Sequence, residues 1–201
     1  HDDLSVENAL YYTALLRMRS NMKKQEVMEW VYKAIEDVKL TGKEKLKISS
    51  LSGGQKKRVS IAMELLSDPK VIFLDEPTSG LSPDLDLEMM ELLKELARKG
   101  RTIVVVTHAM ENLDKCDKIA FLGCGGRLVF YGKQAEVFRY FNKKSYSRIF
   151  AALTDEAVCK SFEARYKNSE YYKELAASFE KLYDSDRPKE EETAEAGDEE
   201  I

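Results

Sequence analysis

Residues that could bind or hydrolyse a phosphate compound occur at three places in this 201-residue sequence. The first is Leu51–Gln55, where Ser-Gly-Gly precedes an amphipathic stretch. We expect bare backbone N–H groups and the positive end of a helix here, an arrangement that binds phosphate. The glycines would allow a ligand to approach the backbone closely. An ordinary serine cap followed by a glycine turn is the alternative interpretation of this segment taken alone.

Two adjacent acids, Asp75 and Glu76, form the second place. They follow the apolar run 71–74, which is typical of a buried parallel strand. Ligands of open α/β sheets bind at the carboxyl ends of the strands. An aspartate at that position can hold Mg²⁺, and a neighbouring acid can activate water. A pair of solvated acids at the start of a loop is the alternative.

His108 is the third place, and it follows a second apolar run, 102–107. A helical pattern at 84–99 separates the two runs, and the order strand, helix, strand indicates a parallel crossover. His108 should therefore lie at the same sheet edge as Glu76. A lone histidine is more often structural, but this shared edge favours a functional role.

Together these segments resemble the ATP-binding-cassette (ABC) ATPase family. LSGGQ resembles its signature motif, VIFLDE its Walker B strand with the catalytic glutamate, SGLS its D-loop, and His108 its switch histidine. The longer form LSGGQKKRVSIAMELLSDPKVIFLDEPTSGL, with GRLVFYG and Tyr140-Phe141, is similar to the G-type transporter subfamily. The opening HDDLSVENALYYTALLRM resembles the segment after the family's Q-loop glutamine. The resemblance covers roughly residues 1–145 and, more faintly, 146–183.

The resemblance implies a role for each matching residue. In this family two cassettes sandwich two ATP molecules head to tail. Asp75 would hold Mg²⁺, Glu76 would polarise the attacking water, and His108 would contact the γ-phosphate and stabilise the developing charge. Four residues would contact the γ-phosphate of the ATP held by the opposite subunit: Ser52, Gly53, Gly54 and Gln55.

The D-loop departs from the family pattern at one position. Its residues are Ser79, Gly80, Leu81 and Ser82, and the family normally has Asp at the last of them. Ser82 followed by Pro83 favours an N-cap and a first-turn proline for the next helix. The short neutral side chain predicts weaker coupling between the two ATP sites.

The 201 residues contain no G-x-x-x-x-G-K-[ST] segment, with which a cassette holds ATP. Gly42-Lys43 is followed by Glu44, and Gly132-Lys133 is followed by Gln134. We expect the ATP-binding loop, the adenine-stacking aromatic and the Q-loop glutamine to lie upstream of His1. The chain would then be the carboxyl two-thirds of a cassette and should neither bind ATP tightly nor hydrolyse it alone.

The elements expected to position these residues make a partial ABC ATPase fold of the α/β class. Helical spacing of apolar residues predicts helices at 5–19, 24–39, 52–67, 84–99, 134–141 and 155–183, and two short strands at 118–122 and 127–131 predict a hairpin. Ser5 should cap the first helix, and Gly42 should end the second. We expect a helical signature subdomain at 1–68, the Walker B to switch-histidine part of the core at 69–145, a helical extension at 146–183 and an acidic linker or disordered tail at 184–201.

Composition limits the function classes. The formal net charge is −4, and nine acids with only two bases fall in 184–201. Residues 1–183 are therefore mildly basic, but they show no clustered basic face of the kind that binds nucleic acid. Three widely spaced cysteines and two histidines argue against a zinc site and fit a reducing compartment. No apolar run approaches the ~20 residues that span a membrane.

We therefore expect the carboxyl-terminal part of an ATP-hydrolysing nucleotide-binding domain that uses ATP and Mg²⁺. Its partners would be a second nucleotide-binding domain and a transmembrane domain downstream in the same polypeptide, and it would lie at the cytoplasmic face of the membrane. A soluble cassette ATPase of translation or DNA repair is one alternative. A non-catalytic interaction module made of the helical lobe is another. A membrane domain encoded downstream of Ile201 would favour the transporter.

Overall fold

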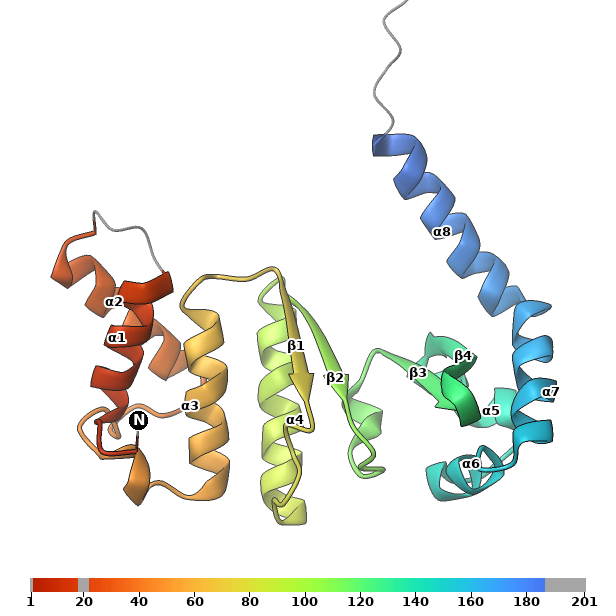
Figure 1. Cartoon of the computed structure of the whole chain (residues 1–201), viewed down its shortest axis with the longest axis horizontal. Coiled ribbons are helices and arrows are strands. Elements are labelled where there is room, and N and C mark those ends of the chain that lie inside the picture. The colour runs from red at the N-terminus through yellow and green to blue at the C-terminus, as the bar shows by residue number, and fades with distance from the viewer. Residues whose placement is uncertain (1, 18–21, 187–201) are drawn as a thin grey trace, which may run out of the picture. The chain divides into compact units, whose positions relative to one another are not determined.

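The computed structural model describes residues 2–17 and 22–186, with side chains through Leu182. The chain divides into two compact units, His1–Asp117 and Lys118–Ile201 (Figure 1). The division falls inside the range 69–145 that the sequence assigned to one part of the core. The four-part subdivision expected from the family resemblance stays a prediction.

Three helices make the first part of unit one: α1 (Val6–Arg17), α2 (Lys24–Asp37) and α3 (Gly53–Leu65). Each of these helices packs against the other two. The serine cap predicted for α1 is present, since the Asn8 N–H donates to Ser5 Oγ at 3.3 Å. The short 3₁₀ helix Ile48–Ser50 leads from the connection after α2 into α3.

The second helix ends earlier than predicted, and Gly42 does not end it. The residue after its C-cap is Lys39, whose φ of 58° lies in the left-handed region. The Lys39 N–H donates to Glu36 O and the Leu40 N–H donates to Ile35 O, both at 2.9 Å. This is the hydrogen-bond pattern of a Schellman motif with lysine at the position where glycine is common. Gly42 takes a positive φ in the turn that follows.

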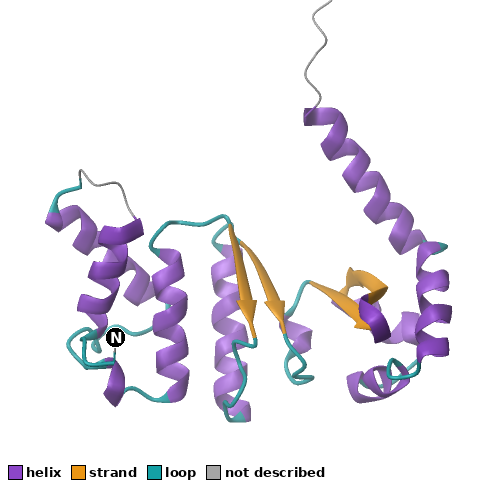
Figure 2. Ribbon diagram, in the orientation of Figure 1, coloured by secondary structure: helices purple, strands orange, loops and turns teal. Residues whose placement is uncertain are grey.

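A parallel strand pair follows α3. β1 (Val71–Asp75) and β2 (Thr102–Val106) pair in register from Val71 opposite Thr102 to Asp75 opposite Val106. The helix α4 (Pro83–Arg98) makes the crossover between them. Figure 2 shows the two strands running side by side in the same direction. The predicted strand–helix–strand crossover is therefore confirmed.

Only one face of this strand pair is covered in the described part of the chain. Ile72 is 4% exposed and lies in the core with α3 and α4, and Ile103 and Val105 pack against that core. On the opposite face Phe73 is 75% exposed and Val106 is 58% exposed. In the described residues the predicted strands are buried on one face, because alternate side chains of a strand point to opposite faces and the helices lie on one of them.

Unit two begins with the predicted hairpin. β3 (Lys118–Gly123) and β4 (Arg127–Lys133) are antiparallel, with an irregularity after Phe121. The rest of the unit is helical: a 3₁₀ turn at Gln134–Glu136, α5 (Val137–Phe141), α6 (Tyr146–Ala152), α7 (Glu156–Lys167) and α8 (Glu170–Asp186). The helical extension expected at 146–183 consists of three helices, α6, α7 and α8, whereas apolar spacing had predicted a single helical stretch at 155–183.

Aromatic side chains form the centre of unit two. The Phe130 ring lies 4.8 Å from the Tyr140 ring and 5.8 Å from the Phe141 ring, centroid to centroid. Phe130 and Cys159 are fully buried. Residues 184–186 of the predicted acidic tail belong to α8, which continues through Asp186, and 187–201 lie outside the described residues.

Candidate functional site

The acidic turn after β1 has an unusual backbone. Asp75 is the last residue of the strand, and Glu76 follows with φ of 48°, in the left-handed region. A side chain other than glycine costs roughly 1–2 kcal/mol in that region. The Glu76 N–H donates to Val106 O at 2.8 Å and so extends the strand pairing by one residue. The turn therefore holds Glu76 in a conformation that it would not adopt alone.

Two donors meet at the Glu76 carbonyl oxygen. The Ser79 N–H donates to it at 3.2 Å from within the same turn. The Lys57 ammonium donates to it at 3.1 Å from α3. No pattern in the sequence indicates that Lys57 reaches this turn, since Lys57 and Glu76 are 19 positions apart and on different elements.

The structure brings Glu76 and His108 into direct contact. Glu76 Oε1 accepts a hydrogen bond from the His108 backbone N–H at 3.0 Å and lies 2.7 Å from His108 Nδ1. Thr107 Oγ1 donates to the other carboxylate oxygen, Oε2, at 3.4 Å. The parallel crossover thus places the predicted acid and the predicted histidine at one sheet edge, as the sequence indicated.

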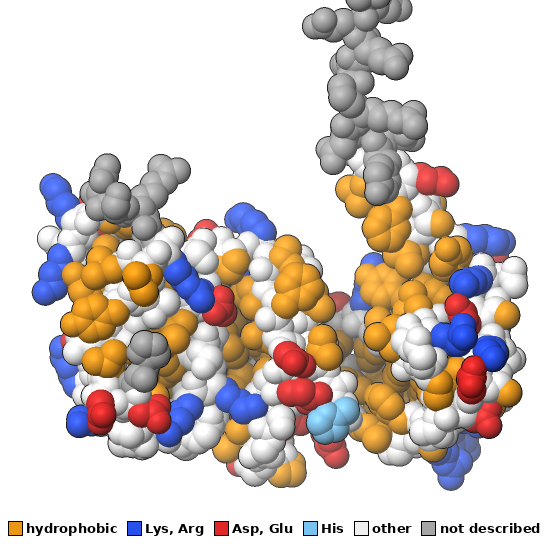
Figure 3. Space-filling model, in the orientation of Figure 1, with side chains coloured by type: hydrophobic (Ala, Val, Ile, Leu, Met, Phe, Trp, Pro, Cys, Tyr) orange, Lys and Arg blue, Asp and Glu red, His pale blue; other side chains and the backbone are white. Residues whose placement is uncertain are grey.

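Hydrogen bonding changes the acidity of Glu76. The bond from the His108 side chain is the largest cause that lowers the pKa of the Glu76 carboxyl below its ordinary value of 4.5, and burial opposes this shift. Glu76 is accordingly a carboxylate at neutral pH. The His108 side chain is 83% exposed. In Figure 3 the histidine (pale blue) lies at the surface beside acidic side chains (red).

The helix α3 begins with a reciprocal cap. Ser52 Oγ accepts from the Gln55 N–H at 3.3 Å, and Gln55 Oε1 accepts from the Ser52 N–H at 3.1 Å. A Cβ at Gly53 would meet nothing within 4 Å, so the backbone there is open to a ligand. Gly54 is buried, and a Cβ there would lie 3.8 Å from Leu81 and Leu85 side chains. The two glycines therefore differ: one is accessible and the other packs against the D-loop and α4.

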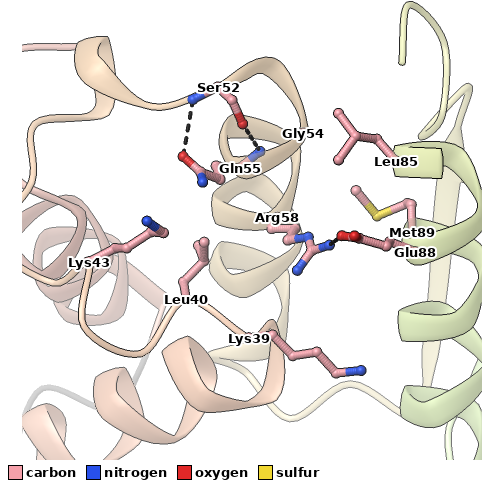
Figure 4. A pocket seen from close by; sticks show the side chains of 10 residues that line it. All are labelled: Lys39, Leu40, Lys43, Ser52, Gly54, Gln55, Arg58, Leu85, Glu88 and Met89. Carbon is pink, nitrogen blue, oxygen red and sulfur yellow. Dashed lines mark hydrogen bonds and ion pairs between the residues drawn. The ribbon is translucent and has the colours of Figure 1, made fainter. Parts of the chain in front are cut away.

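A cavity lies beside the start of α3, and Figure 4 shows its lining. Its residues come from the connection after α2, from the first turns of α3 and from α4: Lys39, Leu40, Lys43, Ser52, Gly54, Gln55, Arg58, Leu85, Glu88 and Met89. Arg58 Nη2 and Glu88 Oε2 lie 2.6 Å apart and join α3 to α4. Its volume of about 100 Å³ is well below the ~300–1,000 Å³ of small-molecule sites. We conclude that this cavity is a packing gap and not a nucleotide pocket.

The D-loop segment Ser79–Ser82 is a tight turn between the acidic residues and α4. Gly80 takes φ of 74°, and the Leu81 N–H donates to Thr78 O at 3.1 Å. Ser82 occupies the N-cap position of α4 with proline after it, as predicted, but its side chain makes no cap to the helix backbone. Its hydroxyl bonds to Asp84 instead, which lowers the pKa of the Asp84 carboxyl.

The residues present at the acidic turn fit a hard cation. Mg²⁺ is usually held by one or two carboxylates together with waters and substrate phosphates. Asp75 offers one exposed carboxylate beside the ionised Glu76. Among the described residues no cluster of three or more His, Cys, Asp or Glu side chains could hold a metal by itself. Within those same residues, no helix is both long and apolar enough to cross a membrane.

Sequence comparison decides the family. A family model described as "ABC transporter" matches residues 4–79. An ABC transporter ATP-binding/permease protein of Mycobacterium tuberculosis is 37% identical over 156 residues, covering 78% of this chain and 18% of that protein. The chain belongs to the ABC transporter family. ABC transporter G family member 1 of Dictyostelium discoideum is 36% identical over 152 residues, covering 71% of this chain and 19% of that protein. The ABC chain thus spans less than a fifth of these relatives.

Structural comparison agrees on the fold. The cbiO1 protein of Clostridium perfringens, described as part of an ABC transporter complex, matches with a TM-score of 0.60 and 32% identity over 74% of this chain and 61% of that one. The predicted partial α/β ABC ATPase fold is confirmed. The positions of the signature, Walker B, D-loop and histidine residues in this ABC chain follow from the geometry above, whereas their roles remain to be proposed.

Proposed function

We propose that this chain is part of the ATP-hydrolysing nucleotide-binding domain of a G-type ABC transporter. The contact between Glu76 and His108, at the carboxyl edge of β1 and β2, carries the proposal. A carboxylate beside Asp75 and an exposed imidazole, at that edge of a parallel sheet, suit phosphoryl transfer to water. The G-type relative and the relative described as both ATP-binding and permease favour a transporter over a soluble cassette.

Each residue at the edge takes a part in hydrolysis. ATP is the substrate, and Mg²⁺ bound by Asp75, partly through water, would neutralise charge on its phosphates. Glu76 polarises the attacking water: its Oε1 is engaged by His108, whereas Oε2 accepts only a long bond from Thr107 and keeps lone pairs for that water. His108 contacts the γ-phosphate and stabilises the charge that develops on it.

The start of α3 serves a different ATP molecule. In a head-to-tail dimer Ser52, Gly53, Gly54 and Gln55 contact the γ-phosphate of ATP bound to the second nucleotide-binding domain. The open space at Gly53 and the helix N-terminus support this assignment. A transmembrane domain, downstream in the same polypeptide, would place the dimer at the cytoplasmic face of the membrane.

The substitution Glu76→Gln tests the proposed function in the full-length protein. It keeps the size of the side chain but removes the carboxylate, so we expect ATP binding to persist and steady-state hydrolysis to fall by about 10²-fold or more. Glu95→Gln on α4, where the side chain is 48% exposed, is the matched control and should leave turnover unchanged. Retained hydrolysis in Glu76→Gln would refute Glu76 as the catalytic carboxylate.

A further inference from the structure

One hydrogen bond connects the helix of the signature motif to the acidic turn. Lys57 lies on α3, two positions after Gln55, and its ammonium donates to the Glu76 carbonyl oxygen at 3.1 Å. A hydrogen bond from a charged donor is stronger than one between neutral groups. The Lys57 side chain is partly buried, which further favours a fixed geometry.

The backbone of Glu76 needs such external support. Its φ of 48° is a conformation that persists only where the surroundings impose it. Of the three hydrogen bonds to its backbone groups, the bond to Val106 O comes from the neighbouring strand and that from Ser79 comes from the same turn. Lys57 supplies the third, and it is the bond that comes from α3.

The orientation of the Glu76 carboxylate depends on that backbone. A movement of the Glu76 backbone would displace its side chain relative to His108 and Thr107, which bond to its two oxygens. A displacement of about 1 Å in a catalytic group can cost about 10²-fold in rate. A contact that fixes the position of the Glu76 backbone therefore bears on catalysis without touching the substrate.

We propose that Lys57 is a positioning residue that holds Glu76 in its hydrolytic orientation and couples it to the signature helix. This inference rests on the proposed function. Because α3 carries both Lys57 and the residues assigned to the partner's ATP, a shift of α3 on nucleotide binding would move the Lys57 ammonium relative to the Glu76 carbonyl. The water-activating acid of one site would thus respond to the state of the other.

Steady-state kinetics of the full-length protein test the proposal. In Lys57→Met, which keeps the apolar length of the side chain, we expect kcat to fall by about tenfold or more, with KM for ATP within about twofold of wild type. Lys57→Arg keeps a charged donor and should retain at least half of the wild-type kcat. Lys70→Met, an exposed lysine at the amino end of β1, is the matched control and should behave as wild type.

Hydrogen exchange of the same variants gives a readout that does not depend on turnover. Amides of the peptide 72–81 should exchange faster in Lys57→Met than in wild type or Lys70→Met, since the turn loses the bond from α3. A kcat within about threefold of wild type, or unchanged exchange, would overturn the proposal. So would a rise in KM with unchanged kcat, which would assign Lys57 to nucleotide binding.

The two proposals can fail separately. If Glu76→Gln hydrolyses ATP like wild type, the proposed function fails, whatever Lys57→Met does. If Glu76→Gln is inactive but Lys57→Met keeps its kcat, the proposed function stands and only the role of Lys57 is lost.

Discussion

Glu76 is held by its backbone and by its side chain at once. Its amide, its carbonyl and both carboxylate oxygens each take part in a hydrogen bond, to partners on β2, in the residues directly after β2, on α3 and in its own turn. Strain of this kind is typical of functional sites, where the surrounding structure fixes a group in the geometry that the chemistry needs. The acid and His108 are therefore best regarded as one unit, and substitution of either changes the other.

The acidity of Glu76 tests this pairing. The lowered pKa means that ionised Glu76 contributes stability fully above its ordinary value of 4.5, and that this contribution is lost as pH falls through the lower folded pKa. In His108→Ala the pKa of Glu76 should rise towards 4.5, because the hydrogen bond from the His108 side chain, the largest cause of the lowered pKa, is removed. A carboxyl NMR titration measures this. Glu64, whose pKa is lowered by Arg17, should not change and serves as the internal control. An unmoved Glu76 midpoint would contradict the pairing.

Ser82 is the residue at which segment 79–82 departs from the D-loop pattern that the family resemblance implies. Its hydroxyl is neutral and bonds to Asp84 within its own helix turn. Ser82 therefore offers no negative charge to a partner subunit. We expect Ser82→Asp in the full-length protein to raise the cooperativity of ATP hydrolysis, read as the Hill coefficient. Ser60→Ala, an exposed position on α3, is the control. An unchanged Hill coefficient in Ser82→Asp would show that this position does not limit coupling.

Among the helices and strands, α2 ends in an unusual way. The residue after its C-cap is Lys39, at a position where glycine is common. Lys39 takes the left-handed conformation, and its ammonium lies 2.7 Å from Glu95 on α4. Both side chains are about half exposed, so the ion pair contributes at most about 1 kcal/mol. The Schellman hydrogen bonds and the packing of the buried Leu40 after it fix the end of the helix instead.

A pair of variants isolates the backbone strain at Lys39. Lys39→Gly and Lys39→Ala both lose the ion pair, but only glycine relieves the left-handed conformation. We expect the glycine variant to be more stable by about 1 kcal/mol in urea unfolding. At Lys33, exposed in the interior of α2, the order should reverse, with glycine less stable than alanine by about 1 kcal/mol. Equal stability of the Lys39 variants would mean that the helix end relaxes.

At the scale of the whole molecule, the exposed face of β1 and β2 sets the described chain apart from a finished α/β core. Phe73 and Val106 are exposed on that face, whereas the side chains on the other face pack against helices. Apolar patches that face water commonly mark surfaces that other residues cover. We therefore expect other residues of the proposed nucleotide-binding domain to cover this face of the sheet.

A nucleotide titration tests whether the 201-residue chain binds ATP by itself. The sequence has no G-x-x-x-x-G-K-[ST] loop, and the cavity beside α3 is too small for a nucleotide. We expect a Kd for ATP weaker than about 1 mM, equivalent to less than about 4 kcal/mol of binding. The full-length protein is the positive control in the same calorimetric assay. Micromolar affinity of the chain alone would contradict the prediction.

Local patterns in the sequence predicted most of the elements and the sheet edge at which the chemistry is placed. Apolar periodicity and turn residues record local burial, so they located the α3 cap, the parallel crossover and the hairpin. They also placed Glu76 and His108 at one edge, because the ends of parallel strands meet there. They failed at Lys39, where tertiary packing outweighs the preference for glycine at a helix end.

How the groups at that edge meet depends on the tertiary structure. The contact of His108 with Glu76 joins residues 32 positions apart, and that of Lys57 with Glu76 joins residues 19 apart. Such contacts depend on where whole helices and strands lie, which no local pattern encodes. The same holds for the left-handed backbone of Glu76, which exists because bonds from three directions impose it.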